Sequence, residues 1–552
     1  MATPIRAQPV PNPRLPTPVL PTPTPLPETE PLPPLEELLP QIEDTPSIPQ
    51  PSPEQIPGTI IVKQFQVIGS TVFTSEELAP ILEPFTQRPI SFAQLLEAQD
   101  AITQFYQDRG YLNSGAFIPP QTLQNGVVTI EVIEGEVEAI EVTGTRRLKP
   151  SYIRSRLALA TQAPLNQERL LTALQLLQLD PLIENLSAEL AAGSRPGLSQ
   201  LEIKVQEADA FSSQLTLDNQ RSPSVGSIRR QLQLTHGNLL GFGDRFNLTY
   251  SNTDGNNTLD DISYTLPINP RNRTLSLSYS RSQSNIIEEP FDRLNIESKS
   301  RSYELTYRHP LKQTPTVEFA LGLTASRQET ETSLLDMPFP LSAGANDNGE
   351  TKISALRFFQ EYTQRSNRNV FALRSQFTLG INAFNATINS NAPDSEFFAW
   401  RGQAQYLHLL APDTILVLRS DLQLADQALV PLEQFSVGGQ LTVRGYRQDT
   451  LLADNGLFAS AELRFPILRI PDWKMLVQVT PFFDFGTVWN SSNSDTDIET
   501  STLSSVGLGL RFLLGNNFNA RLDWGVPLVD LESNRDNLQE KGIYFSIQYT
   551  PF

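Results

Sequence analysis

Apolar and polar residues alternate along most of the chain from about residue 209 to the C-terminus. Clear examples are residues 274–279, 318–323 and 517–524. Successive side chains of an extended chain point to opposite faces, so this period of two predicts β-strands with one apolar and one polar face. Turns rich in Asn, Asp, Gly, Ser and Pro separate about 16 such segments. Each has about 21 residues available, enough for a membrane-spanning strand of about 9–11 residues and its loop.

Two architectures fit these strands. A soluble sandwich or propeller buries one face of each sheet, whereas an outer-membrane barrel turns its apolar face to lipid and its polar face to an aqueous lumen. The polar faces carry charges at strand centres, which favours the barrel. These charged residues include Arg419, Asp421, Arg521 and Asp523. All four tryptophans also fall in this region, as the aromatic girdles of a barrel require, namely Trp400, Trp473, Trp489 and Trp524.

The last alternating segment covers residues 543–550 and is followed by Pro551 and Phe552. A terminal amphipathic strand that ends on an aromatic residue is what outer-membrane barrels present to the barrel-assembly machinery, so we expect that partner. Tyr549 lies three residues before Phe552 rather than two, which predicts a shifted signal or a bulge at Pro551. The alternative is an ordinary C-terminal strand.

Helical signals appear between short alternating segments in residues 59–135. An alternating stretch at 61–67 predicts a strand, and capping boxes at 74–77 and 91–94 start two helices. The second helix ends near Gly110, and further alternating residues predict strands that close this part of the chain. The result is a small sheet with two helices on its apolar face.

Residues 136–208 repeat the same order of strand, helix, helix, strand, strand. The predicted helices are 150–159 and a second one capped by Asn166, and the predicted strands that follow lie around 186–190 and 201–205. Two consecutive units of similar length predict tandem α+β modules rather than one enzyme domain. The alternating residues 209–552 then form a third domain.

The N-terminal residues 1–58 contain 19 of the 44 prolines of the chain. Such a composition favours extended polyproline conformations and predicts a disordered tether or linker. Residues 34–43 are compatible with a short helix, because proline is tolerated at its first position and glutamate near its positive end. A wholly disordered segment is the alternative.

Composition excludes several classes of function. The net charge of −19 and pI near 4.7 argue against nucleic acid as a partner. The chain has no cysteine, which excludes disulfides, thiol nucleophiles and cysteine-bound metals, and its three histidines show no metal-binding spacing. No apolar run is long enough for a transmembrane helix, and no secretory signal is visible, so a signal was removed or is not used. We expect no cofactor, no metal site and no enzymatic activity.

One pair of segments is the candidate functional site. Residues 435–456 form a loop between two strands that is too long for a hairpin, and Val443-Arg444-Gly445-Tyr446-Arg447 lies inside it. Phe482-Phe483-Asp484-Phe485-Gly486 follows in a strand, with Asp484 on the face opposite Phe483. A carboxylate enclosed there is costly without a cation, and Arg444 is the candidate partner. The alternative is a chance match beside a solvated aspartate.

These residues resemble those of a known family, the two-partner secretion transporters (TpsB), which include the ShlB/FhaC/HecB haemolysin secretion/activation proteins. The similar motifs are Gly110-Tyr111, Pro119-Pro120-Gln121, Val132 to Gly135, Asp218-Asn219, Gly226, Asn238 to Asp244, Gly438-Gly439, Val443 to Tyr446, and Phe482, Asp484 and Gly486. The resemblance covers the chain from about residue 59 onward.

The resemblance implies a 16-stranded antiparallel transmembrane barrel over 209–552 in the outer membrane, in contact with its lipid. Two periplasmic POTRA domains, 59–135 and 136–208, would precede it, and an N-terminal helix would plug the pore at rest. The expected activity is export of an unfolded partner exoprotein of haemolysin or adhesin type from the periplasm to the cell surface. The N-terminal tract is longer and richer in proline than a plug and short linker require.

The resemblance also implies roles for single residues. Arg444, Gly445, Tyr446 and Asp484 would lock an infolded loop to the barrel wall, with Val443, Arg447, Phe482 and Gly486 as supporting residues. Exposed sheet edges of the POTRA domains would bind the client by strand addition, and the candidate residues are Phe117, Ile118, Gln121, Leu186 and Leu190. The alternative function is an insertase or assembly factor for outer-membrane proteins, which is usually built with more POTRA domains.

Overall fold

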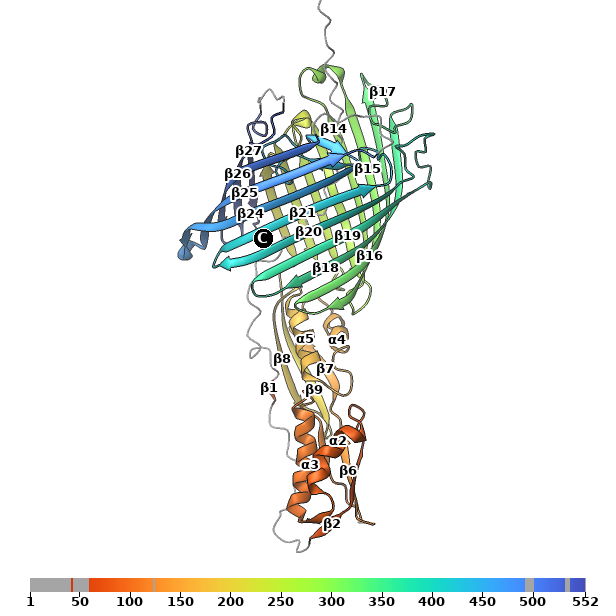
Figure 1. The fold of residues 1–552 in the computed structure, drawn as a ribbon, viewed down its shortest axis with the longest axis vertical. Helices are drawn as coiled ribbons and strands as arrows, with labels where there is room; N and C mark the ends of the chain where they lie inside the picture. Colours follow the sequence, from red (N-terminus) through yellow and green to blue (C-terminus); the bar gives the residue numbers. More distant parts are fainter. Residues whose placement is uncertain (1–40, 43–58, 123–124, 492–500, 532–536, 552) are drawn as a thin grey trace, which may run out of the picture. The chain divides into compact units, whose positions relative to one another are not determined.

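The protein divides into two compact units, each described here by itself. The computed structural model describes residues 41–42, 59–122, 125–491, 501–531 and 537–551. One unit holds Leu32–Asp209 with Leu240–Gly243, and the other holds Ala210–Leu239 and Asp244–Phe552. The first contains two α+β modules and the second a closed barrel (Figure 1). Within the described ranges, no helix is both long and apolar enough to cross a membrane.

The first module combines two α-helices with two small sheets. Its elements are β2 (Ile60–Val62), β3 (Gln64–Ile68), α2 (Ser75–Leu82), β4 (Arg88–Ile90), α3 (Phe92–Gln107), β5 (Gly115–Phe117) and β6 (Val127–Ile133). One sheet has the order β3-β6-β5, and β2 pairs with β4. Leu95 and Ile102 of α3 share a buried core with Val128 and Ile130 of β6, so this helix covers the apolar face of the sheet.

Both predicted capping boxes of this module are confirmed. Thr74 accepts the backbone N–H of Glu77, whose carboxylate accepts the N–H of Thr74, and α2 begins at the next residue. Ser91 and Gln94 make the same reciprocal contacts at the start of α3. Such boxes satisfy backbone donors that the first helical turn leaves without partners.

Two strand predictions in this module are wrong in detail. The alternating residues 61–67 form two strands in different sheets, because β2 ends at Val62 and β3 begins at Gln64. The candidate edge strand that was expected to carry Phe117, Ile118 and Gln121 ends at Phe117. Pro119 and Pro120 lack the backbone N–H that a further ladder would need.

The second module has the predicted order of elements. They are β7 (Glu136–Thr143), α4 (Pro150–Leu157), α5 (Gln167–Gln178), β8 (Ile183–Ala192) and β9 (Leu198–Glu207). Asn166 caps α5 by accepting the N–H of Arg169, as predicted. The helix α4 ends at Leu157, two residues earlier than predicted. The leucines of α5, among them Leu170 and Leu174, pack on β8 and β9 in one buried core.

A short strand from the N-terminal tract joins this second sheet. The strand β1 (Gln41–Ile42) runs parallel to β8, opposite Glu189 and Leu190, so the sheet order is β1-β8-β9-β7. The predicted helix over 34–43 is therefore wrong at these two residues, because the edge of β8 offers them hydrogen bonds that an isolated helical turn does not obtain from tertiary packing. The rest of that predicted helix lies outside the described residues.

Sixteen antiparallel strands form the closed barrel, which confirms the predicted number and architecture. They are β10 (Phe211–Asp218), β11 (Arg229–Gly237), β12 (Arg245–Asn252), β13 (Asn256–Pro267), β14 (Thr274–Asn285), β15 (Glu297–Gln313), β16 (Val317–Leu334), β18 (Glu350–Arg365), β19 (Asn369–Ile381), β20 (Phe398–Ala411), β21 (Thr414–Ala425), β24 (Asn455–Ile470), β25 (Met475–Trp489), β26 (Thr502–Leu514), β27 (Phe518–Pro527) and β28 (Ile543–Tyr549). Pairing of β28 with β10 closes the ring, and β17 (Met337–Pro338) extends the end of β16. The terminal Phe552 lies outside the described residues.

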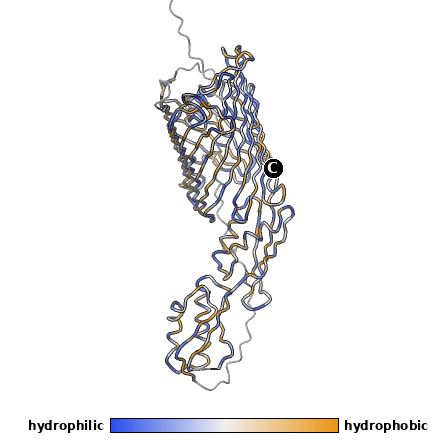
Figure 2. The backbone as a smooth tube through the Cα atoms, turned by 90° about the vertical axis from the view of Figure 1, so that its right-hand side faces the viewer, coloured by the Kyte–Doolittle hydropathy of each residue, from blue (hydrophilic) through white to orange (hydrophobic). Residues whose placement is uncertain are grey.

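The two faces of the barrel differ as the alternation predicts. Hydrophobic and hydrophilic residues alternate along the strands in Figure 2. Outward side chains such as Leu277 and Leu508 remain 62% and 51% exposed, whereas the inward carboxylates of Asp484 and Asp523 are fully buried. An apolar exterior around a polar interior is the arrangement that lipid requires of a barrel.

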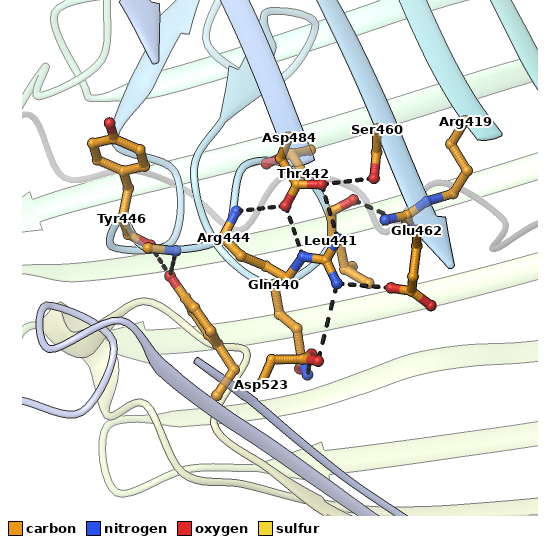
Figure 3. Close-up of polar contacts among 12 residues, drawn as sticks. Arg419, Gln440, Leu441, Thr442, Arg444, Tyr446, Ser460, Glu462, Asp484 and Asp523 are labelled. Atoms are coloured by element: carbon orange, nitrogen blue, oxygen red, sulfur yellow. Dashed lines mark hydrogen bonds and ion pairs between the residues drawn. The ribbon is translucent and has the colours of Figure 1, made fainter. Parts of the chain in front are cut away.

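The loop that carries the candidate site differs from the predicted 435–456. It begins earlier, after β21 ends at Ala425, and it ends earlier, because Asn455 and Gly456 already belong to β24. We call residues 426–454 the infolded loop. It contains a two-stranded sheet of β22 (Phe435–Val437) and β23 (Leu451–Ala453), which places the segment between them against the inner wall (Figure 3).

Candidate functional site: the infolded loop and the inner wall

The infolded loop sits on the wall through an apolar contact as well as a polar one. Phe435, Val437 and Val443 of the loop pack with Phe458 of β24 and with other buried residues of the wall, namely Val488 and Leu503. This cluster anchors the two sides of the loop. It thereby fixes the position of the polar segment that follows Val443.

Glycine at position 486 leaves the space that this contact occupies. A Cβ atom on Gly486 would lie 2.5 Å from a methyl carbon of Val437 and 2.9 Å from one of Val443. Gly525 of β27 has the same function on another side, where a Cβ atom would lie 2.6 Å from the backbone nitrogen of Gly445. The loop therefore approaches the wall at two glycines, one of which sequence analysis had identified.

The structure brings Arg444 and Asp484 together. The Nε of Arg444 donates to Oδ2 of Asp484 at 2.7 Å, and its Nη2 donates to Oδ1 at 2.8 Å (Figure 3). The backbone N–H of Arg444 donates to the same carboxylate at 3.2 Å. The guanidinium lies 3.3 Å from the ring centroid of Phe482, and the arginine side chain is fully buried. A planar fork against a carboxylate with an aromatic face beneath is a geometry that arginine forms and lysine does not.

Further charged residues complete this site, and sequence analysis did not assign them to it. Nη1 of Arg444 donates to Glu462 of β24 at 2.8 Å and lies 4.0 Å from Asp523 of β27. Glu462 also binds Arg464 at 2.8 Å and Arg521 at 2.7 Å. These residues occupy inward positions of their strands. An inward position can be predicted from the sequence, but many other polar residues of the barrel share it, so it does not assign these residues to the site.

The next two residues of the loop bind the last strand of the barrel. The hydroxyl of Tyr544 in β28 accepts the N–H of Gly445 at 3.0 Å and donates to the carbonyl of Tyr446. Tyr446 in turn donates its hydroxyl to the carbonyl of Ser504 at 2.8 Å and accepts the N–H of Val529 at 3.0 Å. The two tyrosines therefore connect the loop to β26, β28 and the loop that follows β27.

The side chain of Arg447 forms its ion pairs with neighbouring loops, and none with a wall strand among the described residues. Its guanidinium binds both oxygens of Glu288 in the loop 286–296, at 2.7 and 2.5 Å, and lies 3.5 Å from Glu540 in the loop 528–542. The predicted supporting role of this arginine is therefore a contact with neighbouring loops. We call these three residues the loop clasp.

The base of the infolded loop has its own polar contacts. Arg357 of β18 binds both oxygens of Glu433, at 2.9 and 2.6 Å. The buried carboxylate of Asp454 accepts the N–H groups of Leu429 and Ser491, at 2.8 and 3.0 Å. Charged contacts thus hold the loop at its base, at Arg444 and at Arg447.

The candidate edge residues of the modules lie in different environments. Phe117 ends β5, which is an edge strand of its sheet, and Ile118 follows it. The side-chain amide of Gln121 donates to the carbonyl of Thr129 at 2.7 Å and accepts its N–H at 2.8 Å, so it binds the backbone of β6 as a strand would.

The two leucines proposed for the second edge are not accessible there. Leu186 and Leu190 are 3% and 8% exposed, because residues at even spacing along β8 point into the core. The backbone of β8 at Leu190 is paired with β1. This edge can offer a client its backbone, but not these side chains.

In each module, the carboxylate of one glutamate near the end of a strand accepts hydrogen bonds from backbone N–H groups of a loop. Glu134 accepts the N–H groups of Thr71 and Val72, at 2.7 and 3.1 Å, and the hydroxyls of Thr71 and Tyr106. Burial raises the pKa of Glu134, but the hydrogen bonds from Thr71, Val72 and Tyr106 outweigh it and hold the pKa below its ordinary value. In the second module, Glu207 accepts three consecutive backbone N–H groups, those of residues 146–148.

Comparison with known proteins identifies the family. A family model for haemolysin secretion/activation proteins (ShlB/FhaC/HecB) matches residues 197–512, and a model for the ShlB-type POTRA domain matches residues 60–135. The chain belongs to this family. Its members are two-partner secretion transporters of the outer membrane, with POTRA domains in the periplasm and without enzymatic activity. The resemblance seen in the sequence is therefore confirmed.

Several characterised proteins are similar along most of the chain. The heme/hemopexin transporter protein HuxB of Haemophilus influenzae (strain 86-028NP) is 23% identical over 496 residues, which are 86% of this chain and 84% of that protein. The outer membrane transporter CdiB of Escherichia coli is 24% identical over 496 residues, 87% and 81% of the two chains. A solved structure of CdiB from Escherichia coli shares the fold, with a TM-score of 0.69, 21% identity and 94% of each chain covered.

Proposed function

We propose that this transporter exports an unfolded exoprotein of haemolysin or adhesin type, and that Arg444 and Asp484 control its pore. The observation that carries the proposal is the fully buried, bidentate contact between the infolded loop and the wall. We call this contact the loop-to-wall lock. The locked loop fills part of the lumen, and an extended client passes when the loop moves away.

Arg444 suits this role because its contacts join the loop to two wall strands, β24 and β25. Removal of one partner of a buried ion pair commonly costs about 3–5 kcal/mol, because the other charge stays buried without a counter-ion. That free energy stabilises the locked arrangement, while the hydrogen bonds between neighbouring strands close the barrel without the loop. A change at Arg444 is therefore expected to alter the pore more than the barrel.

The test compares Arg444→Ala with a matched variant, Arg374→Ala, in cells and in liposomes. Arg374 pairs with Glu361 at 2.6 Å within the wall and has no contact with the infolded loop among the described residues. We expect Arg444→Ala to migrate as a folded barrel on unheated gels and to lose most export of its client exoprotein, because on this proposal each export cycle starts from the locked arrangement. Arg374→Ala should export normally.

Two results would contradict the proposal. Full export by Arg444→Ala would exclude the role of the lock. Accelerated insertion of other barrels into liposomes by the purified protein, without transfer of an unfolded client into the lumen, would favour an assembly factor instead.

Client capture belongs to the same proposal. An extended segment can add to the outer edge of β5 near Phe117 and Ile118, where it would compete with the hydroxyl of Thr103 for the N–H of Ala116. Gln121 already binds the backbone of β6 beside this edge. At Glu189 and Leu190 of β8 the client would have to displace β1, so this part of the edge is available only after β1 leaves it. Affinity from backbone hydrogen bonds suits an exporter, because it places few demands on the client sequence.

A further inference from the structure

Arg419 of the inner wall lies beside the lock without pairing with any of its carboxylates. Arg419 of β21 has no acidic oxygen within 4.0 Å among the described residues. Its Nη1 donates to the carbonyl of Leu441 at 3.4 Å (Figure 3). Its guanidinium lies 5.6 Å from the ring centroid of Phe458. Leu441 belongs to the infolded loop, so withdrawal of the loop would remove this hydrogen bond.

Withdrawal of the loop affects the wall carboxylates unequally. Glu462 keeps Arg464 and Arg521, and Asp523 keeps Arg521 at 2.7 Å. Asp484 loses Arg444 and keeps the hydroxyl of Ser460, at 2.6 Å. The acid that loses its cation and the arginine that loses its acceptor are therefore released by the same movement.

The register of the strands places these two residues near each other. Arg419 lies directly opposite Ser460 on the neighbouring strand, and Ser460 lies directly opposite Asp484 on the next. Strands are about 4.8 Å apart, so the Cα atoms of Arg419 and Asp484 are about 10 Å apart in one row. All three side chains face the lumen, and an arginine side chain is long enough to cross most of that interval.

We propose that Arg419 is the replacement counter-ion of Asp484 in the released state. When the loop withdraws, the guanidinium of Arg419 leaves Leu441 and Phe458 and binds the carboxylate that Arg444 has left. The wall then holds no unpaired buried carboxylate, and the released state is reached more easily. Arg419 is a positioning residue of the gate: it makes no contact with Asp484 while the loop is locked. This inference rests on the proposed withdrawal of the loop.

A double-mutant cycle on the full-length transporter in detergent tests the pairing without any client. The variants are Arg419→Ala, Arg444→Ala and both together, and the measured quantity is the urea midpoint of barrel unfolding. We expect Arg419→Ala alone to shift the midpoint slightly. In the Arg444→Ala background, Arg419 already binds Asp484. Arg419→Ala should therefore shift the urea midpoint several-fold more there than in the wild-type background.

Two further variants serve as controls for this double-mutant cycle. Arg419→Lys in the Arg444→Ala background should restore part of the midpoint, because it keeps the charge, and it serves as the measurement if the double alanine variant does not fold. Arg374→Ala should shift the midpoint equally in both backgrounds. Equal shifts for Arg419→Ala in the two backgrounds would overturn the proposal.

Loop release can be followed directly, because the chain has no cysteine and an introduced thiol is unique. Val443→Cys is suitable, since Val443 is fully buried in the locked loop. In proteoliposomes, its labelling by a membrane-impermeant maleimide should become several-fold slower with Arg419→Ala, recover with Arg419→Lys and become faster with Arg444→Ala. Unchanged or faster labelling of Arg419→Ala would contradict the role.

These measurements separate the inference from the proposed function. If Arg444→Ala exported normally while the cycle still showed coupling, the lock would not control export, but Arg419 would remain the replacement partner of Asp484. If export failed as expected and the cycle were additive, the lock would stand, the role of Arg419 would be excluded, and Asp484 would be hydrated or protonated instead.

Discussion

Four consecutive residues of the infolded loop contact four strands of the barrel and two neighbouring loops. Arg444 binds β24 and β25, and Gly445 and Tyr446 bind β28, with the tyrosine hydroxyl reaching β26. Arg447 binds two neighbouring loops. A short motif therefore has a separate physical requirement at each position. Arg444 supplies a planar fork, Gly445 adopts a positive φ of 99°, Tyr446 supplies an aromatic hydroxyl, and Arg447 supplies a second cation.

Replacement of Arg444 by lysine tests the fork separately from the charge. Lysine keeps the cation, but it cannot donate two parallel hydrogen bonds to Asp484 and a third to Glu462. We expect Arg444→Lys to destabilise the locked state by about 1–2 kcal/mol, with an unfolding midpoint between those of wild type and Arg444→Ala. The measurement is the urea midpoint of the purified protein. A lysine variant as stable as wild type would mean that a point charge is sufficient.

The elements show which parts of the structure a sequence can predict. Local signals were reliable: the capping boxes at Thr74 and Ser91 start helices, and the alternating segments are strands. Contacts between distant segments were not: Tyr544 lies 99 positions from the glycine it binds, and no local pattern links them. The strand β1 was missed for the same reason, since its two residues are held by a partner edge far along the chain.

Arg444 and Asp484 could be paired from sequence for a different reason. An aspartate on the inward face of an apolar strand requires a cation, and a long glycine-containing loop that carries arginine can supply one. The sequence shows no comparable requirement for the other charged residues of the site. Glu462 and Asp523 occupy ordinary inward positions, where polar residues are common in any barrel.

The first POTRA module provides a prediction for an element. The pKa of Glu134 is held below its ordinary value of 4.5 in the folded module, so its contribution to stability is present above that pH and is lost as the pH falls through the lowered pKa. Glu134→Gln should reduce the protection of the Thr71 and Val72 amides by about 1–2 kcal/mol at pH 7. The measurement is hydrogen exchange of the full chain at pH 7 and at about pH 3.5.

The pH dependence of amide protection shows whether the carboxylate of Glu134 causes the effect. Wild type should lose this protection at low pH, whereas Glu134→Gln, which has no carboxylate to protonate, should change little. An equal loss of protection in both proteins would assign the effect to other groups.

At the scale of the whole barrel, the loop clasp would make two neighbouring loops part of the gate, if the infolded loop gates the pore as proposed. The loop 286–296 and the loop that contains Glu540 lie at the same end of the barrel as the infolded loop, because each of the three follows a strand that runs in the same direction. Arg447 connects both to the infolded loop. Withdrawal of the loop from the wall therefore requires the clasp to open as well as the lock.

Arg447→Ala should consequently open the pore without weakening the barrel. A bidentate, partly buried contact stabilises the closed arrangement by about 1–2 kcal/mol, which corresponds to roughly a tenfold change in the population of the released state. We expect about tenfold more open time in planar bilayers and an unchanged urea midpoint of the strands. Arg230→Ala is the control, because Arg230 pairs with Asp254 on the exposed surface and does not contact the infolded loop among the described residues. If Arg447→Ala kept the open time of the control while Arg444→Ala increased it, the lock alone would gate the pore and the clasp would only order the surface loops.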